Sequence, residues 1–375
     1  MMTRADSVRH LYVHLPFCAH RCGYCDFVTL VGRGDQHARY VDALLGELVL
    51  EGGVLSEPLE TIFLGGGTPT FTEPEALRRL LRALPSAGEV TIEANPETIT
   101  SELAKLLAES RITRISLGVQ SFQPGLLEVL ERRAQPDDVR RAIYHLRDAK
   151  IDNISLDLIY GIPGQEPSHL ERDLDQAIAL EPDHLSCYEL EAKPGTRFTH
   201  RYGDELVRQG EAMEGYFERV VERLVTAGYR WYETANFCRP GRQSRHNLGY
   251  WLGRDYLGLG IGAVSTVAGL RWRNAPSLAG YLRTLEDARA PARELEPIDG
   301  ETHRRERLML GLRLDEPVPF ADVEGAVNEE ALARLERLGF AERRPGGLAL
   351  TRRGRFLGGA VTVELMEESL EMATL

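Results

Sequence analysis

Three cysteines near the start of the chain have the residue type and the spacing for metal chemistry. Cys18, Cys22 and Cys25 form a C-x3-C-x2-C pattern. Thiolates are soft ligands that hold iron–sulfur clusters. Three thiolates would leave one iron of a [4Fe–4S] cluster open to a small molecule, as a catalytic zinc keeps one position open. The pattern therefore predicts a [4Fe–4S] cluster on these cysteines.

Two other interpretations of the cysteines compete with the cluster. The three thiols could bind zinc together with His14 or His20, or they could be unrelated core residues. Zinc sites usually pair one C-x2-C with a second such pair further along the chain. Because Cys187 and Cys238 stand alone, the cluster is favoured. We expect Cys187 to lie in the core and Cys238 in a loop without a role.

A run of glycines could bring backbone groups close to a ligand. Residues 65–67 are consecutive glycines, followed by Thr68, directly after an apolar segment. Glycine lets the backbone approach a bound molecule closely. The segment is not a phosphate-binding P-loop, because the lysine of that motif is missing. A tight turn without a ligand is the alternative interpretation.

Four polar residues lie in or beyond later apolar segments. They are Glu93, Gln120, Arg132 and Asp157. Asp157 stands between two leucines, and a carboxylate is costly to bury without a partner. We therefore expect Asp157 to meet either a ligand or an arginine, and Arg132 is the candidate arginine.

The elements that position these residues alternate between two hydrophobic periods. Apolar strand-like segments cover 11–15, 61–64, 90–93, 114–119, 154–159 and 184–190. Amphipathic helical patterns cover 35–52, 74–83, 100–109, 123–149, 167–180 and 205–228. Alternating strands and helices form parallel sheets, whose ligands bind at the C-terminal ends of the strands. The pattern predicts an α/β fold of six units, as an open barrel or a doubly wound sheet.

The rest of the chain is organised differently. The expected domains are an α/β domain at 1–230, an irregular connecting region at 231–300 and a small separate domain at 301–375. In the last segment the expected elements are helices at 304–312 and 329–338 and a hairpin at 340–350. This order suggests a winged-helix-like unit. Its candidate reading helix is acidic, which favours a packing or lid role over DNA binding.

Composition and charge restrict the class of protein. The net charge of −12 argues against a general nucleic-acid binder. No apolar run reaches the length of a transmembrane helix, and the polar start lacks the apolar segment of a secretory signal. An odd number of cysteines, three of them closely spaced, is a poor disulfide framework. We therefore expect a cytoplasmic protein.

The cysteine pattern resembles that of the radical SAM superfamily, whose members bind S-adenosylmethionine (SAM) at the open iron. The sequence YVHLPFC from Tyr12 to Cys18, and the Asp-Phe pair after Cys25, narrow the resemblance. They are similar to the group that contains oxygen-independent coproporphyrinogen III oxidase and the related haem chaperones. The resemblance covers most of the chain and implies a partial (β/α)6 barrel with a small C-terminal helical or winged-helix-like domain.

The resemblance also implies a SAM site. The residues at the matching positions are Tyr12, Gly66, Gly67, Thr68, Glu93, Gln120, Arg132 and Asp157. The first four would meet the methionine end of SAM, and Glu93 would hold the ribose hydroxyls, a sensible pairing of acceptor and donors. A reduced cluster would pass one electron to SAM, which would break to methionine and a 5′-deoxyadenosyl radical.

Three features distinguish the chaperone branch from the oxidase. The oxidase carries a further cysteine where Phe27 stands here, and it has an extension before the cluster, whereas Cys18 lies near the chain start. Residues 245–251 fit the H-N-x-x-Y-W pattern of the haem chaperones. An imidazole can ligate haem iron, and aromatic faces suit a porphyrin. The candidate haem contacts are His246, Asn247, Tyr250 and Trp251, with His246 as the candidate axial ligand.

These features predict a haem chaperone on a radical SAM scaffold, with a [4Fe–4S] cluster, SAM and haem as cofactors. Its expected partners are a haem-acceptor protein and an electron donor such as a flavodoxin or ferredoxin. The alternative is a SAM-cleaving enzyme acting on a tetrapyrrole, such as the oxidase itself. For the aromatic motif, the alternative is a surface loop whose rings pack on the barrel, with His246 solvated or hydrogen-bonded.

Overall fold

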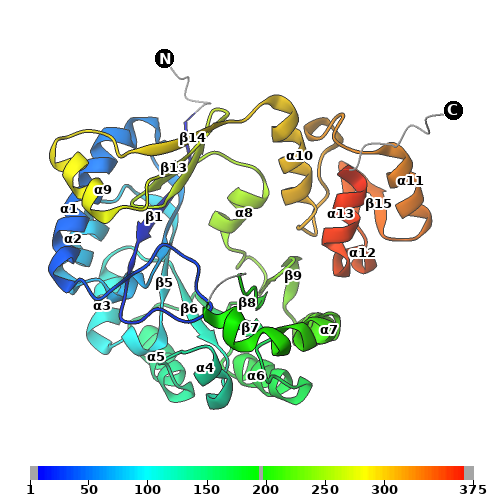
Figure 1. The fold of residues 1–375 in the computed structure, drawn as a ribbon, viewed down its shortest axis with the longest axis horizontal. Helices are drawn as coiled ribbons and strands as arrows, with labels where there is room; N and C mark the ends of the chain where they lie inside the picture. Colours follow the sequence, from blue (N-terminus) through cyan, green and yellow to red (C-terminus); the bar gives the residue numbers. More distant parts are fainter. Residues whose placement is uncertain (1–6, 194–196, 367–375) are drawn as a thin grey trace.

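A mixed β-sheet forms the centre of the molecule (Figure 1). The computed structural model describes residues 7–193 and 197–366. In these residues the sheet has 12 strands, in the order β14-β13-β12-β11-β1-β4-β5-β6-β7-β8-β10-β9. The six predicted strands are confirmed as neighbouring parallel strands: β1 (His10–Leu15), β4 (Leu59–Gly66), β5 (Ala87–Ala94), β6 (Arg114–Gln120), β7 (Ile154–Tyr160) and β8 (His184–Glu189). The α/β barrel fold predicted from the sequence is thereby confirmed.

Helices cover the outer face of the parallel strands (Figure 1). They are α1 (His37–Glu51), α2 (Pro74–Ala83), α3 (Ser101–Glu109), α4 (Pro124–Val129), α5 (Pro136–Asp148), α6 (Pro167–Ala179) and α7 (Arg197–Thr226). Proline begins α2, α4, α5 and α6, where its missing N–H costs little. Leucines on their inner faces, such as Leu77 and Leu146, are fully buried against the sheet.

The continuous helix expected over 123–149 is wrong. The chain leaves α4 after Val129, and Glu131 has a left-handed φ of 56°. Pro136 then begins α5, because proline cannot continue a helix from the preceding turn. The break releases Arg132 from the helical surface, so that its side chain reaches the inside of the barrel.

The irregular connecting region expected at 231–300 is also wrong, because most of it extends the sheet at both edges. One edge gains β9 (Arg230–Glu233) and β10 (Asn236–Cys238), and the other gains β11 (Tyr256–Leu259), β12 (Val264–Val267), β13 (Leu270–Asn274) and β14 (Arg293–Pro297). Helices α8 (Arg245–Trp251) and α9 (Leu278–Glu286) lie between these strands in the sequence. Cys238 is buried in β10, so its expected loop position is wrong, whereas Cys187 is buried in β8 as expected.

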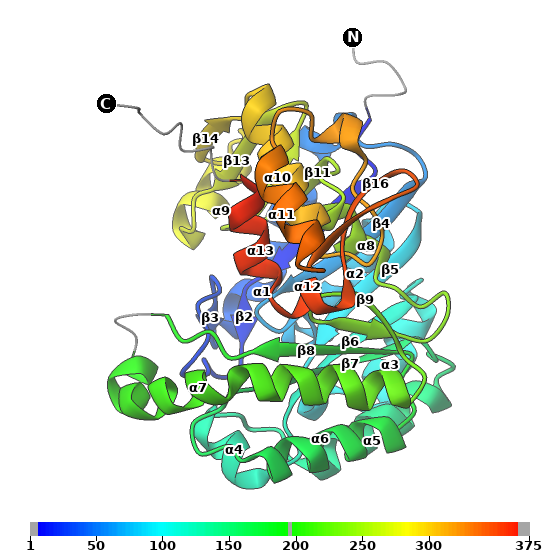
Figure 2. The same cartoon turned by 90° about the vertical axis from the view of Figure 1, so that its right-hand side faces the viewer.

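A smaller unit follows the sheet and lies beside its β9 edge (Figure 2). It contains α10 (Gly300–Gly311), α11 (Glu329–Arg337), the hairpin β15 (Ala341–Arg344) and β16 (Gly347–Leu350), α12 (Arg352–Phe356) and α13 (Gly358–Met366). The two expected helices and the hairpin are confirmed, and α12 and α13 were not predicted. Leu308, Leu332, Leu348 and Leu365 form its own core. No helix in the described residues combines the length and apolar character needed to span a membrane.

Candidate functional site

The three motif cysteines lie on a segment that a pair of short strands holds at both ends. After β1, the short strand β2 (Phe17–Cys18) pairs with β3 (Leu30–Val31), and the loop between them carries Cys22 and Cys25. Cys18 is buried, the other two are half-buried, and all three are free thiols. They line one cavity of about 530 Å³, which opens at the C-terminal ends of the parallel strands. We call this the barrel cavity.

Hydrogen-bonding groups surround the thiols. Cys18 Sγ lies 3.4 Å from Thr68 Oγ1, and Arg132 Nη1 lies 3.7 Å from Cys22 Sγ. Burial raises the pKa of the Cys18 and Cys25 thiols, so in the absence of a metal they favour the protonated form. A cluster with three thiolates is anionic, and the Arg132 guanidinium offers it a buried cation.

The two histidines considered as zinc ligands contact other groups instead. His14 Nδ1 is 3.0 Å from Tyr12 Oη, and its Nε2 is 2.9 Å from the carbonyl oxygen of Val28. His20 faces Glu131 at 3.9 Å. Among the described residues, no three thiol, imidazole or carboxylate groups converge on one metal ion. A cubane places each thiolate on a different iron and needs no such convergence, so these residues fit a cluster better.

The glycine run packs tightly against the cysteine loop. A Cβ atom on Gly67 would lie 2.6 Å from the carbonyl oxygen of Pro16. One on Gly66, whose φ is 110°, would lie 2.4 Å from the His14 ring. Both glycines are therefore required by the turn itself, whatever ligand it meets. Their backbone and Thr68 line the barrel cavity beside Cys18.

Two carboxylates face the barrel cavity from β5 and β7, which flank β6 in the sheet. Glu93 accepts a hydrogen bond from the backbone N–H of Gly66 at 3.1 Å. Burial, and next the charge of Asp157, raises the pKa of Glu93 to about 7. Asp157 accepts hydrogen bonds from Ser116 at 3.0 and 3.1 Å and from Ser155 at 3.4 Å. Burial raises its pKa as well.

The ion pair considered for Asp157 and Arg132 is absent from the described residues. Arg132 Nη2 donates to Asn95 Oδ1 at 2.8 Å and to the carbonyl oxygen of Gly118 at 2.7 Å. Gln120 lies close by, with a left-handed φ of 67°, where the register between β6 and β7 shifts. Such bulges redirect a side chain, and Gln120 lines the barrel cavity.

The predicted cluster and SAM residues all line this one cavity. They are Cys18, Cys22, Cys25, Tyr12, Gly66, Gly67, Thr68, Glu93, Gln120, Arg132 and Asp157. Sequence reasoning missed Asn95 and Ser116, which hold Arg132 and Asp157 in place. Asn95 lies just after β5, the strand that carries Glu93, and that position was the available signal.

Helix α8 carries the aromatic motif and closes one side of the barrel cavity. His246, Asn247 and Tyr250 line the cavity. His246 is 1% exposed. Its Nδ1 lies 2.7 Å from Thr61 Oγ1 and its Nε2 lies 2.9 Å from Tyr250 Oη. Burial lowers the pKa of His246 to about 3, so the ring is neutral. The solvated form of the alternative is wrong, because the ring is buried, whereas its hydrogen-bonded form agrees with the two contacts of the ring nitrogens.

Comparison with known proteins shows to which family this chain belongs. Residues 12–177 match the Radical SAM superfamily, and residues 298–357 match the HemN C-terminal domain. The chain is 36% identical to heme chaperone HemW of Mycobacterium tuberculosis, over 95% of this chain and 94% of that protein. It is 33% identical to heme chaperone HemW of Bacillus subtilis, over 94% of this chain and 98% of that protein. The chain belongs to the HemW family of radical SAM proteins.

The family assignment confirms the resemblance drawn from the cysteine motif. It also implies SAM and a [4Fe–4S] cluster as cofactors. Coproporphyrinogen III oxidase (HemN) from Escherichia coli has a similar structure, with a TM-score of 0.78 and 22% identity, over 97% of this chain and 91% of that one. At that identity the likeness shows a shared fold.

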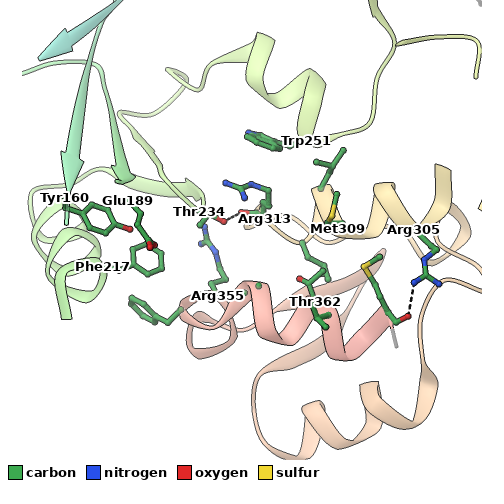
Figure 3. A pocket seen from close by; sticks show the side chains of 17 residues that line it. Tyr160, Glu189, Phe217, Thr234, Trp251, Arg305, Met309, Arg313, Arg355 and Thr362 are labelled. Carbon is green, nitrogen blue, oxygen red and sulfur yellow. Dashed lines mark hydrogen bonds between the residues drawn. The ribbon is translucent and has the colours of Figure 1, made fainter. Parts of the chain in front are cut away.

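This HemW-family chain has a second cavity, which sequence reasoning did not predict. It has a volume of about 930 Å³ and lies between the barrel and helices α10, α12 and α13 (Figure 3). Trp251, the last residue of the aromatic motif, lines this second cavity rather than the barrel cavity. Glu189, at the end of β8, lines both cavities, so the two adjoin. Helix α8 therefore faces both.

Proposed function

We propose that this chain binds haem and passes it to acceptor proteins, on a scaffold that carries a [4Fe–4S] cluster and SAM. The observation that carries the proposal is the position of α8. Its histidine, asparagine and tyrosine face the cavity that contains the three cysteines. The relatives that match nearly the whole chain bear the name heme chaperone. The chemistry of the site and the names of the relatives therefore point the same way.

In this proposal the barrel cavity holds the cluster and SAM. Cys18, Cys22 and Cys25 ligate the cluster. Tyr12 and the turn at 66–68 meet the methionine end of SAM. When bound, the cluster supplies one electron for cleavage of the SAM sulfonium. The chain's own residues orient SAM, exclude water and supply the buried cation Arg132, which Asn95 fixes in place.

Replacing Glu93 with glutamine should weaken SAM binding at least about tenfold, because a hydrogen bond to a charged group is worth about 1.5–3 kcal/mol. Glutamine keeps the size of the side chain but loses its charge toward the ribose hydroxyls. Isothermal titration of the reconstituted protein with SAM measures the change. Glu97→Gln, at an exposed position just beyond the strand, is the control. Equal affinities for the two variants would remove Glu93 from the SAM site.

Haem binding tests the proposed function itself. Anaerobically reconstituted protein is titrated with haem, and the Soret band is followed. We expect saturation at about one haem per chain. Transfer is then tested by mixing the haem-loaded chain with an apo-haem protein. The Soret signal of the haem-loaded chain should be lost as haem moves to the acceptor. The absence of saturable binding would overturn the proposal, and turnover of coproporphyrinogen III to a vinyl-bearing product would support the enzyme alternative instead.

Two variants of α8 test the axial ligand with effects of opposite sign. Nε2 of His246 is engaged by Tyr250 Oη, so ligation of iron requires that hydrogen bond to open. His246→Ala should weaken haem binding, whereas Tyr250→Phe should strengthen it several-fold, because it frees Nε2 and keeps the aromatic face. His145→Ala, on the outer helix α5, controls for adventitious ligation. If all three variants bind haem equally, His246 is not the ligand.

The partners follow from the same chemistry. Reduction of the cluster requires a one-electron donor, for which a flavodoxin or ferredoxin is suited, and haem transfer requires an acceptor protein. We also infer a cytoplasmic location, because five free cysteines and an open-iron cluster suit a reducing compartment.

A further inference from the structure

The second cavity combines flat apolar walls with arginines. Its apolar side chains include Phe217, Trp251, Met309 and Phe356. Arg305, Arg313 and Arg355 also line it, and Figure 3 shows Arg313 and Arg355 directed between the barrel and the C-terminal helices. Among the described lining residues, Glu189 is the one carboxylate. Its volume of about 930 Å³ is that of a site for a large organic ligand.

Arg355 has donors that nothing in the described residues uses. Its Nη1 donates to the carbonyl oxygen of Trp231 at 2.9 Å, and its guanidinium carbon lies 3.6 Å from the centre of the Trp231 ring. Its Nε and Nη2 are closed to solvent and have no hydrogen-bond partner in the described parts of the chain. Burial lowers the pKa of Arg355 to about 10. A buried cation with unpaired donors is costly unless an acceptor completes it.

A second unpaired donor lies across the same cavity. The indole Nε1 of Trp251 is buried and has no partner among the described residues. The guanidinium of Arg313 lies 4.4 Å from the centre of the Trp251 ring, and its Nε donates to Glu233 at 2.7 Å. Arg313 is thus fixed beside Trp251, and its charge is shared with one buried carboxylate.

We propose that the second cavity receives the carboxylate edge of the haem, with Arg355 as the principal partner of a propionate and Trp251 as part of the wall. This inference rests on the proposed function. Haem is a flat apolar ring with two carboxylates at one edge, and this cavity offers flat apolar faces with arginine donors. A carboxylate reaches Nε and Nη2 once the guanidinium turns toward it, and an arginine fork matches a carboxylate.

The position of α8 makes this arrangement compatible with ligation by His246. The helix spans seven residues, with His246 facing the barrel cavity at its start and Trp251 facing the second cavity at its end. The two cavities adjoin at Glu189. A haem lying along this junction can present its iron to the helix and its propionates to Arg355.

The experiment compares haem with haem dimethyl ester, which lacks the two negative charges. Wild-type protein should bind haem about tenfold or more tightly than the ester. In Arg355→Gln that preference should largely disappear, because haem affinity falls and ester affinity changes little. The ratio is measured within each folded variant, so a general loss of stability does not imitate the effect. Quenching of tryptophan fluorescence provides a second readout of occupancy.

Arg352→Gln is the matched control, since Arg352 lies exposed on the same helix α12 and does not line the cavity. It should keep the wild-type preference for haem. If Arg355→Gln does not fold, Arg355→Lys keeps the charge without the planar fork and should give an intermediate ratio. Saturable haem binding with the same ratio in the Arg355 variant and the control would overturn this inference alone. The absence of saturable haem binding by the wild type would overturn the proposed function.

Discussion

Replacing any one of Cys18, Cys22 and Cys25 with alanine should abolish the iron–sulfur cluster. An open-iron cluster has no spare protein ligand. The loss of one thiolate therefore leaves two of the four irons without a protein ligand. Anaerobic reconstitution followed by iron and sulfide analysis should show a fall from about four irons per chain to nearly none. The visible absorption of the cluster should disappear with them. SAM binding should be lost as well, because the chelating iron is gone.

The chain supplies its own control for this result. Cys187 and Cys238 are free, and both are buried in the sheet, in β8 and β10. Neither lines the barrel cavity. Cys187→Ala and Cys238→Ala should therefore keep the full iron content, although each removes buried volume and costs some stability. A Cys22 variant with full iron content, or a Cys238 variant without iron, would contradict the assignment of the cluster to the motif.

The parallel strands were predictable because each is buried on both faces. Residues such as Ile62, Ile92, Leu117 and Leu156 are fully buried, so the strands appear in the sequence as short continuous apolar segments. Their order along the chain is also their order in the sheet. The helices between them have regular apolar periods. Local pattern and overall topology therefore agree in the first half of the chain.

The strands after α7 were not predictable from such patterns. The six strands β9 to β14 have only three to five residues each, which is too short for a period to appear. Their pairing depends on distant segments: Tyr256 pairs with His10, and Ser186 pairs with Asn236. The residues of these strands become buried through that pairing. The sequence of the region alone therefore gives little indication of which residues are buried.

The candidate site was predictable to the extent that topology brings strand ends together. Glu93 and Asp157 come from different strands of the parallel part of the sheet, and their meeting follows from the rule for ligand sites at the ends of parallel strands. Their hydrogen-bond partners are less predictable. Ser116 bonds Asp157 across β6 and β7, and Thr61 bonds His246 over 185 positions of sequence. The second cavity depends on how the C-terminal unit packs, and no local pattern describes that.

The buried histidines of α8 and β1 should make the protein sensitive to acid. A hydrogen-bonded row runs from His10 through Thr61 to His246 and on to Tyr250. Burial lowers the pKa of His10 to about 4 and that of His246 to about 3. In the unfolded chain both histidines titrate near 6.5. The unfolded state therefore binds more protons below that pH, and stability falls as the pH drops from about 6.5 toward 4.

Each histidine should contribute about 2 kcal/mol of lost stability between pH 7 and pH 5, because the loss approaches about 1.4 kcal/mol for each pH unit below pH 6.5. Urea unfolding followed by circular dichroism at pH 7 and pH 5 measures the difference. His246→Asn removes one titrating group, so its stability should depend less steeply on pH by about 2 kcal/mol over this interval. His145→Asn, on α5, should keep the wild-type dependence. If His246→Asn lost stability as steeply as the wild type, the imidazole would already be protonated in the folded protein, and the neutral ring required for iron ligation by Nε2 would not be present.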